Sequence, residues 1–204
     1  MWLLTMVFAC QTPKNSGDRF GETLLNQLMM DAPNILVDKS DEKLYLVRSG
    51  EILTLDDKEL YWDISLGTVP EGHKQQEGDK KTPEGLYRYT DYHSSSSYHG
   101  SLLIHYPNPI DAAQAVEDGR ITASVQKEIQ SADKNQQHPP MLTGMGGYIL
   151  VHGTHKKGAD LFPSNIRYLY TDGCVGMSND DIDELRAYLL EDVVLQKGRI
   201  LIIP

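Results

Sequence analysis

The chain has 204 residues, of which 40% are hydrophobic and 24% charged, so it is long enough for one domain with a sizeable core. Its formal net charge of −10 argues against nucleic acid and against docking on anionic lipid, because both partners require a basic face. No internal run of the sequence approaches the roughly 20 apolar residues that a membrane span requires.

The N-terminus differs from the rest of the chain. Residues 2–9 are uniformly apolar, and Cys10 then opens the polar stretch 11–18, which is typical of the end of an export signal. Residues 7–10 resemble a bacterial lipobox, in which the cysteine is acylated and becomes the mature N-terminus. We expect lipidation at Cys10, with a plain cleaved signal or a cytosolic chain as alternatives.

The pattern along the chain predicts three parts: a signal or lipobox segment (1–10), a tether or short helix (11–33) and one domain (34–204). Alternating apolar residues and turn signals predict strands in the domain. A helical insertion is expected at about 109–138, and Ser178 is expected to cap a further helix. The predicted fold is mostly β with peripheral helices. Its strands are expected at 43–48, 51–55, 60–66, 85–92, 101–106, 148–151 and 199–203.

A cysteine in a glycine turn, Cys174, follows His152 by 22 positions, and His152 ends the apolar run 148–151. A thiol becomes a useful nucleophile when a neighbouring base removes its proton, and imidazole is the usual base. If the fold brings the two residues together, the pattern predicts a cysteine acyl-transfer enzyme. Cys174 would be its nucleophile and His152 its general base and acid.

Two glycines complete the predicted catalytic group. Gly153 is small enough to expose its carbonyl, which we expect to hold the His152 imidazole by its other nitrogen. Gly173 lets the backbone turn, so that its N–H and that of Cys174 face a developing oxyanion.

Cys174 has other interpretations. If Cys10 carries lipid, Cys174 lacks a disulfide partner and persists as a free thiol in an oxidising compartment. A Cys10–Cys174 bridge or an inert buried Cys174 is the structural alternative. A zinc site is a rival chemistry because His152 and His155 form a close pair, but the sequence contains no His-Glu-x-x-His pattern. We therefore expect neither metal nor cofactor.

These motifs resemble the YkuD-type L,D-transpeptidase catalytic domain. The histidine-glycine at a strand end, followed by a Gly-Cys turn, carries the resemblance. Residues 72–85, 101–108 and 173–179 resemble the YafK-like branch of the family. The resemblance covers the chain from about Ile35 to the C-terminus.

The resemblance implies a β-rich fold whose cysteine forms a thioester on peptidoglycan stem peptides, at the L-centre of a diaminopimelate residue. The following D-amino acid leaves, and an amine or water then takes the acyl group. Many family members have histidine and arginine where this chain has Asp172 and Gly176. The difference favours hydrolysis or a specialised acceptor. The alternative is a non-catalytic peptidoglycan-binding lipoprotein with the same fold.

Further residues are expected to contact substrate. In the loop 72–85, lysines could meet stem-peptide carboxylates and acidic residues an amine. The expected partners are stem peptides and a peptidoglycan-linked lipoprotein, with membrane contact only through a lipid at Cys10. The expected location is the periplasmic face of the cell envelope. The candidate substrate-binding residues are Lys74, Glu77, Asp79, Thr82, Tyr98, His99, Thr171 and Asp172.

Overall fold

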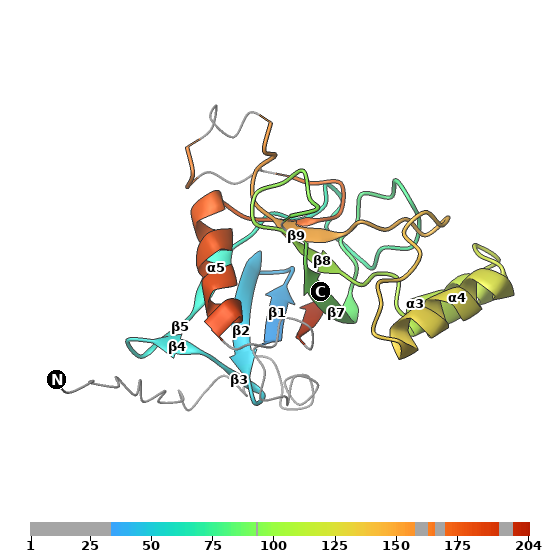
Figure 1. Cartoon of the computed structure of the whole chain (residues 1–204), viewed down its shortest axis with the longest axis horizontal. Coiled ribbons are helices and arrows are strands. Elements are labelled where there is room, and N and C mark those ends of the chain that lie inside the picture. Colours follow the sequence, from blue (N-terminus) through green and yellow to red (C-terminus); the bar gives the residue numbers. More distant parts are fainter. Residues whose placement is uncertain (1–33, 93, 158–162, 166–169, 192–197) are drawn as a thin grey trace.

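The computed structural model describes residues 34–92, 94–157, 163–165, 170–191 and 198–204. The expected signal, the lipidation site Cys10 and the tether lie outside these residues. In the described part, the strands form one nine-stranded sheet and a two-stranded ribbon, and three helices lie around them (Figure 1). The predicted fold class, mostly β with peripheral helices, is confirmed.

The large sheet is mixed, with the order β10-β9-β8-β7-β11-β1-β2-β3, and β6 also pairs with β2. Two of its pairs are parallel, β1 with β11 and β9 with β10, and the others are antiparallel. The strands are β1 (Asn34–Asp38), β2 (Lys43–Arg48), β3 (Glu51–Ile52), β4 (Thr54–Leu55), β5 (Lys58–Glu59), β6 (Tyr61–Asp63), β7 (Gly85–Asp91), β8 (Leu102–Ile104), β9 (Leu150–His152), β10 (Val175–Gly176) and β11 (Arg199–Ile203).

The strands expected at 51–55 and 60–66 are shorter than predicted. Asp56 and Asp57 adopt positive φ angles of 51° and 62°, which makes the tight turn that joins β4 to β5 as a separate ribbon. After β6, Ser65 pairs with Gly176, so this segment leaves β2 and crosses toward β10.

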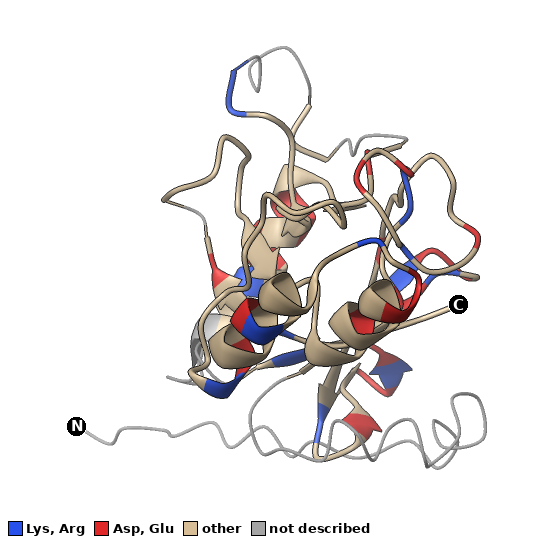
Figure 2. Ribbon diagram, turned by 90° about the vertical axis from the view of Figure 1, so that its right-hand side faces the viewer, with Lys and Arg blue, Asp and Glu red and all other residues tan. Residues whose placement is uncertain are grey.

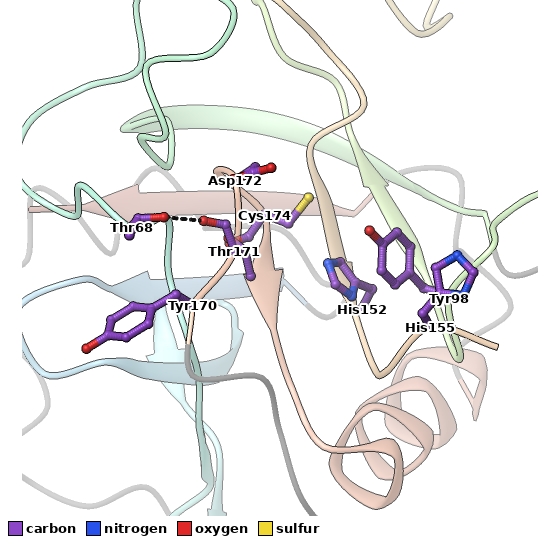
Figure 3. A pocket seen from close by; sticks show the side chains of 8 residues that line it. All are labelled: Thr68, Tyr98, His152, His155, Tyr170, Thr171, Asp172 and Cys174. Carbon is purple, nitrogen blue, oxygen red and sulfur yellow. Dashed lines mark hydrogen bonds between the residues drawn. The ribbon is translucent and has the colours of Figure 1, made fainter. Parts of the chain in front are cut away.

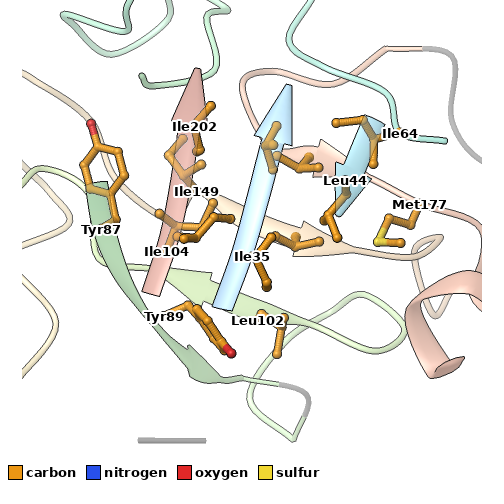
Figure 4. Close-up of a cluster of buried hydrophobic side chains, with 14 of the residues drawn as sticks. Ile35, Leu44, Ile64, Tyr87, Tyr89, Leu102, Ile104, Ile149, Met177 and Ile202 are labelled. Carbon is orange, nitrogen blue, oxygen red and sulfur yellow. The ribbon is translucent and has the colours of Figure 1, made fainter. Parts of the chain in front are cut away.

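The core lies on both faces of the sheet. Figure 4 shows part of the larger of its two clusters. Alternate residues of one strand point to opposite faces, so Ile35 and Val37 join the larger cluster while Leu36 joins the smaller one. All five residues of β1 are buried because β1 is a central strand and both of its faces are covered by core side chains. Burying one such aliphatic side chain contributes about 1.5–3 kcal/mol. The well-packed central strands therefore support the strands β8, β9 and β10 at one end of the sheet.

The helices have clear capping residues. Asn108 begins α3 (Pro109–Glu117), since its side chain accepts from two backbone N–H groups while Asp111 accepts from the Asn108 N–H. Thr122 caps α4 (Ala123–Lys134), which packs on α3. Ser178 caps α5 (Asn179–Glu191) by accepting from the Asp181 N–H at 3.1 Å. The helices in the described part are too short or too polar to cross a membrane.

The polar loop 72–85 is anchored to the sheet. The ammonium of Lys39, at the end of β1, donates to the Gly72 carbonyl (2.9 Å) and pairs with Glu84 (2.6 Å). Only 4% of the Lys39 side chain is exposed, so this ion pair is largely shielded from water. The same loop also lies beside the turn before β10, since a Cβ at Gly173 would be 2.7 Å from the Lys81 carbonyl.

Candidate active site

The thiol of Cys174 lies at the edge of the sheet, just before β10. The parallel register pairs Val175 with Val151 and Gly176 with His152, which sets Cys174 level with Leu150. The Leu150 N–H donates to Sγ (3.4 Å), and the thiol donates to the Tyr148 carbonyl (3.7 Å). The side chain is partly exposed. The two strands thus fix the nucleophile while leaving part of its side chain exposed.

A tight turn presents this cysteine. Gly173 has φ +127°, and a Cβ added there would lie 2.7 Å from the Lys81 carbonyl, so only glycine fits. The Thr171 hydroxyl accepts from the Gly173 N–H (3.1 Å) and donates to the Cys174 carbonyl (2.7 Å). The Gly173 N–H, expected to face an oxyanion, therefore donates within the turn in this structure.

His152 ends β9, and its ring is held in one tautomer. Its Nδ1 lies 2.6 Å from the Gly153 carbonyl, which can only accept. Nδ1 therefore carries the proton, and Nε2 keeps the lone pair that a general base needs. This is the contact that the sequence predicts between Gly153 and the imidazole.

The turn after His152 is fixed by Asn179, at the start of α5. The Asn179 Oδ1 accepts from the N–H (2.8 Å) and the hydroxyl (3.0 Å) of Thr154. A Cβ at Gly153 would collide with the same Oδ1. This role of Asn179 and Thr154 was not predicted from the sequence. The signal that could have pointed to it is an amide side chain at the first position of α5, directly after the cap Ser178.

The ring of Tyr98 covers the imidazole of His152. Their centroids are 3.9 Å apart with the planes inclined by 31°, and the ring of His155 meets Tyr98 edge-on at 5.3 Å. The backbones of Tyr98 and His155 form an isolated bridge, which holds the two loops together. Tyr98, a predicted substrate contact, therefore lies beside the candidate base.

Cys174 and His152 face one pocket of about 330 Å³ from two neighbouring strands (Figure 3). The structure thus brings together two residues that the sequence separates by 22 positions. The pocket is lined by Thr68, Tyr98, His152, His155, Tyr170, Thr171, Asp172 and Cys174.

Removal from water keeps both candidate catalytic groups neutral. Part of the Cys174 side chain is exposed, but the protein groups around Sγ take most of its water away. This desolvation raises the pKa of Cys174 to about 11, against smaller lowering effects of the Leu150 hydrogen bond and the Lys74 charge, while Asp172 raises it further. Burial lowers the pKa of His152 to about 4, although the hydrogen bond to Gly153 acts in the opposite direction. At neutral pH the resting site therefore holds a thiol beside a neutral imidazole.

A second pocket of about 270 Å³ adjoins the first one and shares Asp172 with it. Asp172 is highly exposed and forms an ion pair with Lys80 (2.6 Å). The second pocket is lined by Lys74, Glu77, Gly78, Lys80, Met141, Leu142, Gly146, Gly147, Tyr148, Ile149 and Asp172.

Two predicted substrate contacts, Lys74 and Asp79, instead bind each other. The Lys74 ammonium donates to the Asp79 carboxylate (2.9 Å) and to the Gln76 carbonyl (3.0 Å), and its side chain is 3% exposed. Asp79 also accepts from the Gln75 and Gln76 N–H groups. Burial opposes ionisation of Asp79, but these hydrogen bonds outweigh it and hold its pKa below the ordinary value. The pair shapes the loop 72–85.

Thr82 and His99 lie outside the lining of both pockets. Thr82 is fully buried, and its hydroxyl accepts from the Gly67 N–H (3.0 Å). His99 pairs with Asp183 of α5 at 2.8 Å. The structure therefore gives both residues a place in the scaffold around the site.

The described residues contain no group of three or more His, Cys, Asp or Glu side chains that could hold a metal ion. His155, which suggested a zinc pair with His152, instead packs its ring against Tyr98. Cys174 is a free thiol here, and its possible disulfide partner Cys10 lies outside the described residues.

The fold and the site define a β-sheet domain with a cysteine and a histidine presented by adjacent parallel strands. Residues 32–199 match the family model described as YkuD, the L,D-transpeptidase catalytic domain. The chain therefore belongs to this family, as its motifs predicted. Membership of the YafK-like branch stays a prediction. No curated protein matches the chain.

Solved structures of other proteins have a similar fold. The K307A mutant of the helical cell shape determining protein Pgp2 from Campylobacter jejuni is 21% identical, with a TM-score of 0.51, over 94% of this chain and 56% of that one. Bd1075 from Bdellovibrio bacteriovorus is 23% identical, with a TM-score of 0.48, over 85% of this chain and 48% of that one. The chain thus spans about half the length of these two proteins. An L,D-transpeptidase from Xylanimonas cellulosilytica is 15% identical, with a TM-score of 0.37, over 85% of this chain and 61% of that one.

Proposed function

We propose that the chain is a cysteine-dependent acyl-transfer enzyme that acts on peptidoglycan stem peptides. The observation that carries the proposal is the pair of Cys174 and His152 facing one pocket, with His152 Nδ1 bound to the Gly153 carbonyl. Membership of the L,D-transpeptidase family supports the choice of substrate.

In the first step, Cys174 Sγ attacks the carbonyl at the L-centre of a diaminopimelate residue while His152 Nε2 takes the thiol proton. Because both groups start neutral, proton transfer accompanies the attack instead of preceding it. The imidazolium then gives the proton to the amine of the following D-amino acid as the C–N bond breaks. A thioester on Cys174 remains.

An amine or water then attacks the thioester, His152 accepts a proton from this nucleophile, and the proton returns to Sγ as it leaves. We propose the Cys174 N–H as a donor to the oxyanion in both steps. The Gly173 N–H could join it only after leaving the Thr171 hydroxyl. One such donor typically contributes on the order of a hundredfold in rate.

Attack by an amine gives a crosslink or attaches a lipoprotein, and attack by water releases what was linked. The proposal covers both outcomes, with a peptidoglycan-linked lipoprotein as a candidate partner. Since peptidoglycan lies outside the cytoplasmic membrane, we place the domain at the periplasmic face of the envelope. A lipid on Cys10 would hold it there.

The test is mass analysis of purified muropeptides after incubation with the full chain, its Cys174→Ala variant and its Cys10→Ser variant. We expect wild type and Cys10→Ser to give the same change: a lost D-amino acid, a new crosslink or a released lipoprotein stub. Cys174→Ala should give none. The same products from Cys174→Ala would show that Cys174 is not the nucleophile.

A second candidate function is peptidoglycan binding without turnover. The observation that favours it is the contact of the thiol, which donates to the Tyr148 carbonyl (3.7 Å). Desolvation also raises the pKa of Cys174, and a thiol that stays protonated is a poor nucleophile. A binder should retain muropeptides unchanged, and its affinity should be the same in the Cys174→Ala variant.

A further inference from the structure

Two pockets meet at Asp172, directly before the Gly-Cys turn. The first contains Cys174 and His152, and the second extends past Tyr148 and Ile149. The thiol donates to the carbonyl of Tyr148 (3.7 Å), and Tyr148 lines the second pocket. The second pocket therefore begins beside the candidate nucleophile. A group bound there would remain within reach of a substrate attached to Cys174.

The second pocket has four charged lining residues, Lys74, Glu77, Lys80 and Asp172. Lys74 is buried and already bound to Asp79. Lys80 is 49% exposed, so it is the accessible cation among the described lining residues. Its partner Asp172 is 84% exposed. The boundary of the two pockets thus presents one ammonium and one carboxylate that a ligand can reach.

The backbone holds this ion pair in a defined place. Lys80 has a positive φ of 60°, and its carbonyl accepts from the Val69 N–H (3.1 Å). The same carbonyl lies so close to Gly67 that no side chain fits there. Lys80 is therefore fixed at its backbone, and only its side chain is free to change partner.

We propose that the Lys80–Asp172 pair opens to bind an amino-acid zwitterion, with Lys80 on the carboxylate and Asp172 on the ammonium. This inference rests on the proposed function and names the substrate group that the second pocket receives. An exposed ion pair contributes only about 0–1 kcal/mol, so exchanging it for two contacts with a ligand costs little. Glu77 adds a second carboxylate to the lining of this pocket.

Stem peptides offer this chemistry at diaminopimelate. The side chain of diaminopimelate ends in an ammonium and a carboxylate on one carbon, whereas the nitrogen of the following D-amino acid is an uncharged amide until that residue leaves. An ammonium bound to Asp172 would offset the negative charge that raises the pKa of the nearby thiol. Binding of the ammonium in the second pocket would therefore favour attack by the Cys174 thiol in the first pocket.

The test is calorimetric binding to the full-length Cys174→Ala chain, with and without Lys80→Met. The probe is the peptide L-Ala–D-Glu–diaminopimelate–D-Ala. One analogue has a C-terminal amide, and the other has lysine in place of diaminopimelate. Lys58→Met, on the exposed ribbon strand β5, is the matched control.

We expect Lys80→Met to weaken binding of the parent peptide about tenfold, which is about 1.4 kcal/mol, and Lys58→Met to leave it unchanged. The lysine analogue should bind the Cys174→Ala chain weakly, with no further loss in Lys80→Met, because it lacks the side-chain carboxylate. The C-terminal amide keeps the diaminopimelate zwitterion and should bind like the parent. Asp172→Asn should weaken the parent by a similar factor.

Equal binding of the parent by Lys80→Met and Lys58→Met would overturn the inference, and so would full binding of the lysine analogue or no binding of the parent. The proposed function is tested separately, by turnover of muropeptides that depends on Cys174. If such turnover is found but Lys80→Met binds the parent peptide as well as Lys58→Met does, only this inference is refuted.

Discussion

The ring of Tyr98 lies against the imidazole of His152, with centroids 3.9 Å apart and planes inclined by 31°. One face of the imidazole is therefore covered by an aromatic ring, while its Nδ1 is bound to the Gly153 carbonyl. Together these contacts limit rotation of the ring and keep water from it. Removal from water is the main cause of the low pKa of His152.

Replacement of Tyr98 by leucine should change the pH dependence of the reaction. Aromatic pairs contribute about 0.5–1.5 kcal/mol, so a loosened imidazole should lower kcat about tenfold or less. As water reaches His152, the acid limb of kcat/KM should move from about pH 4 toward 6.5. Tyr98→Phe keeps the ring and is the matched control. An unchanged acid limb in Tyr98→Leu would contradict a positioning role for this ring.

Replacement of Asn179 by alanine should destabilise the domain. The buried N–H and hydroxyl of Thr154 would lose their acceptor, which costs about 1–3 kcal/mol of unfolding free energy. Activity should fall as well, because the adjacent Gly153 carbonyl orients His152. Urea denaturation and turnover measure the two effects. Asn135→Ala, at the exposed end of α4, should change stability by less than about 0.5 kcal/mol, and equal losses in both variants would contradict the assignment.

Alkylation of Cys174 should depend on pH in an unusual way. In a Cys10→Ser chain without substrate, the iodoacetamide rate should rise with a midpoint near pH 11, above the ordinary thiol value of 9.0. Asp172→Asn should raise the rate at pH 8 about twofold, since losing a screened anion lowers the pKa of the thiol by a few tenths. A midpoint at or below pH 9 would show that burial does not control this thiol.

Acid should destabilise the fold through two buried histidines. Burial lowers the pKa of His105 and of His152 to about 4 each, below the ordinary value of 6.5. The unfolded state therefore binds protons first as the pH falls. The stability that both sites contribute is full above pH 6.5 and lost by about pH 4, at about 1.4 kcal/mol per pH unit for each site.

The contribution of one site is measured by comparing the unfolding free energy of wild type and His152→Gln between pH 7 and 4. The difference between the two curves should slope by about 1.4 kcal/mol per pH unit near pH 5. Parallel curves would show that His152 titrates normally in the folded chain.

The centre of the site was predictable because its chemistry depends on local backbone geometry. The positive φ of Gly173 and the exposed Gly153 carbonyl leave a readable pattern next to Cys174 and His152. The apolar alternation of β1 and β2 likewise predicted the central strands.

The walls of the pockets were harder to predict, because a sequence does not show which charges neutralise each other. Lys74 and Asp79 resembled exposed ligands of substrate, yet they pair in a nearly buried position. Lys80 lies in the same loop and was not predicted to contact substrate, yet it is the accessible cation among the described residues of the second pocket. Tertiary pairing, which connects Lys80 to Asp172 across 92 positions, decides this difference.

The central claim, covalent catalysis by Cys174, is tested most directly by intact-protein mass spectrometry of the chain mixed rapidly with a diaminopimelate-containing stem peptide. Wild type should gain the mass of the acyl fragment without its D-amino acid, and peptide mapping should place the increment on Cys174. A Cys174→Ala chain that carries the same increment, or a wild type that turns over with no adduct on Cys174 at any time, would contradict it.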